Sequence, residues 1–139
     1  MTYCTQVDIQ KRIGQADLAA LSDYSGDGNP DTDVVEAAIA DACALIDSYL
    51  SVRFTVPVSP VPSVLRARAV NLAVYFLRLG RDSATEDVRR QYEDDVTWLR
   101  EVVSGAVSLG IEPSAAEGDR SPGVQYEGQR RIFGRDEPL

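Results

Sequence analysis

TDVVEAAIADACALIDSYL, at residues 32–50, carries the helical repeat around which the rest of the chain is arranged. Its apolar residues recur at steps of three and four: Val35, Ala38, Ile39, Ala42, Ile46, Tyr49 and Leu50. At 3.6 residues per turn this spacing gathers them on one face of a helix, and that face needs a partner. We therefore expect a core helix from about Asp33 to Leu50, opened by a capping box between Asp33 and Glu36.

The opposite face of this helix is polar and contains several very small side chains. Its residues are Glu36, Asp41, Asp47 and Ser48, with Ala37, Ala40 and Ala44 between them. Because alanine side chains let two backbones approach closely, we expect that another helix or another subunit can pack on this face.

The chain is acidic, but its acidity is concentrated near the N-terminus. The 139 residues have a formal net charge of -8, which argues against a general affinity for DNA or RNA because such binding depends on Lys and Arg. The net charge is -7 for residues 1–50, +1 for residues 51–111 and -2 for residues 112–139. The acidic and arginine-bearing parts of neighbouring copies would attract one another, although solvated surfaces explain the same split.

Residue types that often build metal and catalytic sites are scarce. The chain has no His, and Cys4 and Cys43 fit no metal-ligand spacing, so we expect no cofactor. A disulfide between these two cysteines is conceivable, but free thiols are favoured. No nucleophile motif or phosphate-binding glycine loop is present, so the chain is not expected to be an enzyme. No apolar run is long enough for a signal peptide or membrane span, which favours a soluble protein made in the cytosol.

Four further segments have helical patterns. They run from a Thr5–Asp8 capping box to Gly14, from Asp17 to Leu21, from Ser63 as N-cap to Gly80, and from a Ser83–Glu86 capping box to Gly105. A proline-containing connector after Arg53 is expected to pack over the core. A chain of this length that is 44% hydrophobic buries one modest core. We therefore predict an all-α fold, a small bundle of about four to five helices with an extended C-terminal tail.

The two helices expected after the connector differ in their surfaces. The first is expected to have Leu72 and Phe76 at the centre of its buried stripe. It is apolar except for a narrow stripe of Arg68, Asn71, Tyr75 and Arg78, whose arginines are expected to be solvated. The second is expected to turn Val88, Tyr92, Val96, Leu99 and Val103 inward. Trp98 lies off this second stripe, so it either widens the core contact or anchors a surface between subunits, and core packing is favoured.

An acidic loop before the core helix partly matches a calcium-binding loop. Such loops place oxygen ligands at alternate positions and a glycine at the sixth, and the matching oxygen-bearing residues are Asp23, Ser25, Asp27, Asn29 and Asp31. The twelfth position, normally a bidentate Glu, is Val34. The alternative is an acidic turn whose glycines adopt unusual dihedrals and whose carboxylates stay in water, and we favour this alternative.

The composition changes near residue 114 to Gly, Pro, Ser and charged residues. We expect a helical domain at residues 1–113 and an extended tail at residues 114–139 that orders on a partner. The expected partner-binding residues are apolar anchors and nearby arginines: Tyr126, Arg130, Arg131, Ile132, Phe133 and Arg135. A disordered terminus is the alternative.

Several short motifs, in this order along the chain, resemble the Mu gp36-like family of tailed-phage proteins. They are YCT at residues 3–5, LSDYSGDG at 21–28, the helix at 34–49, the prolines after Arg53, ATEDVRRQYED at 84–94, SGAVSLG at 104–110 and RIFGRD at 131–136. Each motif is weak alone, and their common order and spacing make the resemblance specific.

This resemblance implies a viral head-to-tail adaptor, also called a connector or head completion protein. Such a protein would form a ring of twelve copies beneath the portal protein and contact a stopper or tail terminator on the tail side. DNA would pass through the lumen without specific binding. The chain would then reside in the virion neck, after assembly in the host cytoplasm. The alternatives are a calcium-dependent binding module built on the Asp23 loop and a tail-side terminator protein.

Overall fold

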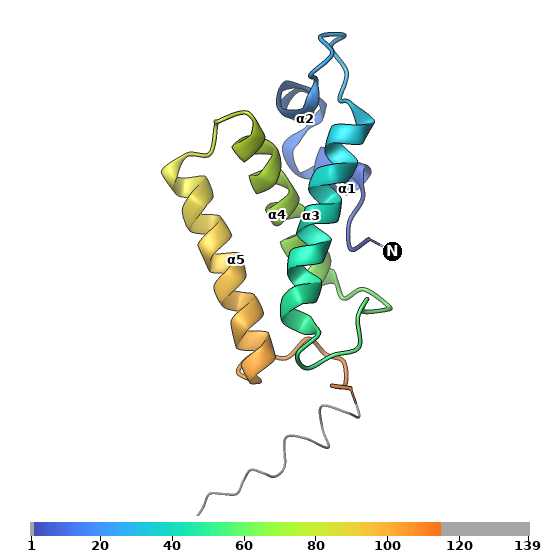
Figure 1. The fold of residues 1–139 in the computed structure, drawn as a ribbon, viewed down its shortest axis with the longest axis vertical. Helices are drawn as coiled ribbons and strands as arrows, with labels where there is room; N and C mark the ends of the chain where they lie inside the picture. The colour runs from blue at the N-terminus through green and yellow to red at the C-terminus, as the bar shows by residue number, and fades with distance from the viewer. Residues whose placement is uncertain (1, 115–139) are drawn as a thin grey trace, which may run out of the picture.

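Five helices make up the regular secondary structure of residues 2–114, the part of the chain that the computed structural model describes. They are α1 Gln6–Ile13, α2 Gln15–Ser22, α3 Thr32–Leu50, α4 Ser63–Gly80 and α5 Glu86–Ser104. The three long helices lie side by side, and α1 and α2 pack near the N-terminal end of α3 (Figure 1). The predicted all-α bundle is confirmed. The tail beyond Ser114 lies outside the described residues, and the division into a domain and a tail stays a prediction.

The apolar stripe of α3 forms the centre of the core. Its largest interface is with α4, and it also contacts α5, α1 and α2. The buried residues on this helix include Val35, Ala38, Ile39, Ala42, Ile46 and Leu50, as the spacing predicts, whereas Tyr49 is half-buried. On α4, Leu65 and Leu72 are fully buried, but Phe76, expected at the centre of its stripe, is half-buried. Phe76 lies toward the edge, where its ring contacts Tyr75 and Tyr92.

One of the three predicted capping boxes is present. Thr5 accepts from the Asp8 amide at 3.2 Å and its own amide donates to the Asp8 carboxylate at 2.9 Å. The predicted box of Asp33 with Glu36 is wrong, because α3 begins at Thr32 and its N-cap is Asp31. The Asp31 carboxylate accepts hydrogen bonds from the preceding loop instead of capping the helix.

The starts of α4 and α5 also differ from the predictions. Ser63 is the first residue of α4 rather than its cap, which is Pro62. Thr85, not Ser83, caps α5 by accepting a hydrogen bond from the Val88 amide at 3.3 Å. The Ser83 hydroxyl donates to the Arg78 carbonyl, so this side chain caps the C-terminal end of α4 instead of the start of α5.

The inward face of α5 is rotated from the predicted one. Its buried residues are Asp95, Val96, Trp98, Leu99 and Val102, whereas Val88, Tyr92 and Val103 are half-buried. Trp98 is 8% exposed, which confirms core packing within this chain. The rotated face meets the polar stripe of α4, where Arg68 pairs with Asp95 and its guanidinium carbon lies 4.9 Å from the centroid of the Trp98 ring.

The connector and both ends of the described chain are packed on the bundle. Phe54 and Val58 are buried, which confirms that the connector covers the core. The buried Tyr3 hydroxyl donates to Asp47 and accepts from the Val58 amide, so it holds the N-terminus against α3. At the other end, the Ser114 amide donates to the Arg53 carbonyl.

Two further expectations concern cysteines and membranes. Cys4 and Cys43 are both buried and free, and burial raises the pKa of the Cys4 thiol to about 12. Among the described residues, no helix combines the length and the apolar character that crossing a membrane requires.

Candidate interaction surfaces

The acidic loop at residues 23–31 folds around its own carboxylates. Asp23 accepts hydrogen bonds from the amides of Gly26, Asp27 and Gly28 at 2.7, 3.2 and 2.7 Å. Asp31 accepts from the amides of Tyr24 and Ser25. The Gly28 amide, followed by the other donors, lowers the pKa of Asp23 below its ordinary value. The loop is therefore a stable acidic turn built by backbone donors.

The same loop is fastened to the C-terminal end of α4. Arg81 donates to the Asp23 carbonyl, and its guanidinium carbon lies 4.1 Å from the centroid of the Tyr24 ring. A Cβ at Gly80 would lie 3.0 Å from the Tyr24 hydroxyl, so this position favours a residue without a side chain. The cation–π contact and the hydrogen bond from Arg81 together hold the acidic loop against the end of α4.

Three of the five predicted calcium ligands come together in this loop. One carboxylate oxygen each from Asp23, Asp27 and Asp31 lies within 4.8 Å of the others. Ser25 is close as well, but its hydroxyl donates to Asp31 at 3.1 Å, and Asn29 donates its amide to Asp27. The twelfth position is occupied by Val34 in the first turn of α3, so the loop lacks the bidentate ligand that completes a calcium site. The geometry fits an acidic turn better than a built metal site.

A buried carboxylate joins α4 to α5. Asp95 is fully buried, and its Oδ1 accepts from Arg68 at 2.7 Å and from Gln91 at 3.2 Å. Its Oδ2 is buried without a hydrogen-bond partner. Burial raises the pKa of Asp95, and the Arg68 guanidinium opposes that rise without cancelling it. The solvated role expected for Arg68 is therefore wrong, because a quarter of its side chain is exposed and its charged end is paired.

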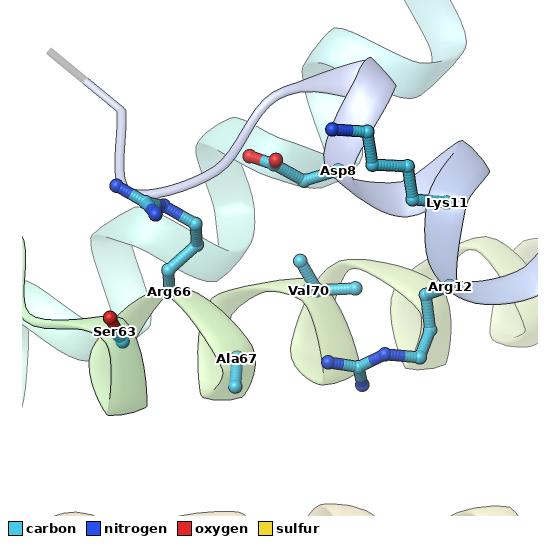
Figure 2. Close-up of a pocket in the computed structure, with 7 residues that line it drawn as sticks. All are labelled: Asp8, Lys11, Arg12, Ser63, Arg66, Ala67 and Val70. Carbon is cyan, nitrogen blue, oxygen red and sulfur yellow. The ribbon is translucent and has the colours of Figure 1, made fainter.

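Two pockets lie along the side of α4 that faces α1, and the second also reaches α5. The first pocket has a volume of about 330 Å³ and is lined by Asp8, Lys11 and Arg12 of α1 and by Ser63, Arg66, Ala67 and Val70 of α4. In Figure 2, Asp8 and Lys11 project from α1 while Arg66 rises from α4 beside them. A second pocket of about 140 Å³ shares Arg12, which donates to Asn71, and continues along α4 to Arg78. We call these two pockets together the α4 groove.

The α4 groove is basic. Lys11, Arg12, Arg66 and Arg78 line it, whereas Asp8 is its one lining carboxylate. None of these four cations forms an ion pair with another residue in the range 2–114. Near Arg78 the groove becomes aromatic, because Tyr75 and Tyr92 stack with their ring centroids 4.3 Å apart. The groove thus has a net positive charge together with apolar surface.

The outer face of α3 has the opposite character, and we call it the α3 ridge. Its exposed residues are Asp33, Glu36, Ala37, Ala40, Asp41, Ala44 and Ser48. The sequence predicts most of this face, but Asp47 does not belong to it, because Asp47 is half-buried and accepts the Tyr3 hydroxyl. The ridge is acidic and has small side chains at its centre.

The predicted partner-binding residues of the tail (Tyr126, Arg130, Arg131, Ile132, Phe133 and Arg135) lie outside the described residues. Sequence patterns also miss two features that the structure reveals. Asp95 stands within the apolar spacing of α5, and a charged residue at such a position is a detectable signal for a buried pair. The groove has no such signal, because its cations come from two helices separated by about fifty residues of chain.

Comparisons with known proteins agree with the resemblance of the short motifs. Residues 3–127 match the family model described as Bacteriophage Mu, Gp36. The chain is 35% identical to "Gene product J" of Escherichia phage Mu over 137 residues, which cover 97% of this chain and 96% of that protein. It is 37% identical over 102 residues to "Mu-like prophage FluMu protein gp36" of Haemophilus influenzae, covering 73% of this chain and 71% of that protein. The chain therefore belongs to the bacteriophage Mu Gp36 family.

Proposed function

We propose that the chain is a head-to-tail adaptor that forms a ring beneath the portal protein and joins the DNA-filled head to the tail. The observation that carries this proposal is family membership over nearly the full length of a phage Mu protein. An all-helical domain with oppositely charged outer faces suits a subunit that packs beside copies of itself. The role needs no catalysis, and we propose none.

The proposed partners follow from that position. The ring would contact the portal protein above and a stopper or tail terminator below, and twelve copies would match the portal. DNA would pass through the lumen without specific binding, since a net charge of -8 repels phosphate on average. The protein would assemble in the host cytoplasm and remain in the virion neck.

A cryo-EM map of the neck tests the role most directly. The expected result is density for this five-helix domain in a ring against the lower face of the portal. If density for the domain is found only on the tail tube, the chain is a tail-side terminator and not an adaptor. Deleting the gene should leave filled heads and tails that accumulate separately, and normal joining without the protein would refute the proposal.

The tail is proposed to dock on the portal ring. Removing residues 121–139 should leave helical content and the melting transition nearly unchanged, because the five helices lie within residues 2–114 and pack on one another there. The same truncation should abolish joining of heads to tails, and Phe133→Ala should produce a milder defect, as measured by infectious titre. Multivalency in the ring lets each contact be weak. A truncated chain that assembles particles at normal yield, or that fails to fold, would contradict this docking role.

A further inference from the structure

We propose that the α4 groove of one subunit binds the α3 ridge of the next subunit, so that one contact repeated around the ring builds the assembly. This inference rests on the ring proposed above and identifies the surfaces that close it. The two surfaces match in charge, length and shape, and they lie at different positions on the subunit.

Charge favours this pairing over contacts between like surfaces. The groove presents Lys11, Arg12, Arg66 and Arg78 without ion pairs among the described residues. The ridge presents Asp33, Glu36 and Asp41, all exposed and outside every described salt bridge. Between residues 13 and 52 the chain has no Lys or Arg, so the ridge has no nearby cation in sequence to neutralise it. Two grooves or two ridges facing one another would repel, whereas a groove facing a ridge attracts.

Length and shape also match. Ser63 and Arg78 are 15 residues apart on α4, and Asp33 and Ser48 are 15 residues apart on α3. Each surface therefore extends about 22 Å along its helix at 1.5 Å per residue. Ala37, Ala40 and Ala44 keep the ridge narrow, so the α3 backbone of one subunit can approach the groove of a neighbour closely.

The positions of the two surfaces make the contact repeatable. Leu65, Ala69 and Leu72 of α4 are buried in the core that α4 shares chiefly with α3, while the groove uses other positions around α4 and no residue of α3. The ridge consists of the exposed positions of α3, so it faces away from α4. Groove and ridge therefore lie on different sides of one molecule. When two copies make a groove–ridge contact, one copy keeps a free groove and the other a free ridge. Further copies can therefore add in the same way until a ring closes.

Charge reversal with complementation tests the pairing in the phage or prophage that encodes the chain, with its own gene deleted. The groove-reversed variant is Lys11→Glu with Arg66→Glu, and the ridge-reversed variant is Glu36→Arg with Asp41→Arg; all four positions are exposed. Each variant supplied alone should lower infectious titre by at least roughly 100-fold, because like charges then face one another. Supplying both variants together, or all four substitutions in one chain, should restore the titre to within about tenfold of wild type. Arg89→Glu with Arg100→Glu is the matched control, since both residues are exposed and line neither pocket, and it should leave the titre unchanged.

The outcomes that overturn the inference are distinct from those that overturn the adaptor role. Single variants that assemble normally, a control that fails equally, or folded single variants that the mixture does not rescue would each refute the groove–ridge contact. Failure of the mixture to rescue folded single variants is the result expected if a portal subunit or DNA occupies the groove. Heads and tails that join normally when the chain is absent would instead refute the adaptor role.

Cross-linking supplies an independent readout, because Lys11 is the chain's one lysine. A zero-length carbodiimide reagent applied to particles assembled from mixed isotope-labelled and unlabelled chains should join Lys11 of one copy to Glu36 or Asp41 of another. Mass spectrometry identifies such mixed-label peptides. A chain that is present in particles but whose Lys11 joins only other proteins, or no carboxylate, would refute the contact while leaving the adaptor role intact.

Discussion

The acidic loop at residues 23–31 and the contact between α4 and α5 each depend on an aspartate, and the two aspartates behave oppositely. Asp23 lies at the surface and accepts three backbone hydrogen bonds, spread over both carboxylate oxygens. Asp95 is fully buried, accepts two hydrogen bonds on one oxygen and leaves the other without a partner. Hydrogen bonding lowers the pKa of Asp23, whereas burial raises the pKa of Asp95 although Arg68 lies 2.7 Å away.

The difference shows what decides whether a carboxylate stabilises its surroundings. Water and several donors favour the charged form at Asp23, so the charge organises the loop. At Asp95 one cation and one amide do not replace the lost water, so the charged form costs free energy even though it is paired. The four predictions below test this contrast.

The largest effect is expected from removing the cation beside the buried carboxylate. Arg68→Ala should lower the free energy of unfolding at neutral pH by about 3 kcal/mol, because it leaves a buried charge without its partner. Urea denaturation measures the change. Arg90→Ala is the control, since its ion pairs on α5 are exposed and should contribute less than about 0.5 kcal/mol. Equal effects for the two variants would show that Arg68 does not compensate a buried charge.

The pH dependence of the free energy of unfolding should show that the charged form of Asp95 destabilises the folded protein. Its pKa in the folded protein is raised above the ordinary value of 3.8, so its stabilising contribution is present below that value and is lost as pH rises through the folded-state pKa. Asp95→Asn does not titrate and should therefore gain stability relative to wild type across that rise. Denaturation at several pH values from acid to neutral provides the comparison. A wild type that gains stability relative to Asp95→Asn as pH rises would reverse the sign and contradict the assignment.

A smaller and local effect is expected at Asp23. Asp23→Ala removes the acceptor of the Gly26, Asp27 and Gly28 amides, so these amides should exchange hydrogen with solvent faster while the core amides of α3 stay protected. Because the pKa of Asp23 is lowered, its contribution is present above the ordinary pKa and is lost as pH falls through the folded-state value. Acidifying the wild type should thus reproduce the loss of protection, measured relative to the intrinsic exchange rate at each pH because that rate itself falls on acidification. Unchanged exchange in the variant would mean that Asp31 and Arg81 hold the loop without the Asp23 carboxylate.

The smallest expected effect is that of calcium. The loop lacks a bidentate twelfth ligand, and amides already engage its carboxylates, so the dissociation constant should be no tighter than about 1 mM. Isothermal titration calorimetry measures it directly. Micromolar binding that Asp27→Ala abolishes would make the loop a calcium site and would support the binding-module alternative.

Particular residues show why some features were predictable from sequence. Val35, Ile39 and Ile46 are buried as their spacing predicts, because helical periodicity is a property of a short continuous segment. The turn at Gly14 between α1 and α2 was predictable for the same reason, since its φ of 89° favours glycine. The capping boxes at Asp33 and Ser83 were wrong because a second candidate cap lies two residues away at each helix start, Asp31 before α3 and Thr85 before α5. A local pattern does not choose between two such neighbours.

The sequence by itself determined the all-helical class, the core face of α3, the acidic turn and the family. Each of these is encoded in residues close together in the chain, or in the order of short motifs. Only the tertiary structure decided that Arg68 meets a buried Asp95, that Lys11 and Arg66 line one groove, and that the groove and the α3 ridge lie on different sides of the molecule. These features depend on which helix faces pack together. A polar side chain acquires its partner, its exposure and its pKa only when that packing is complete.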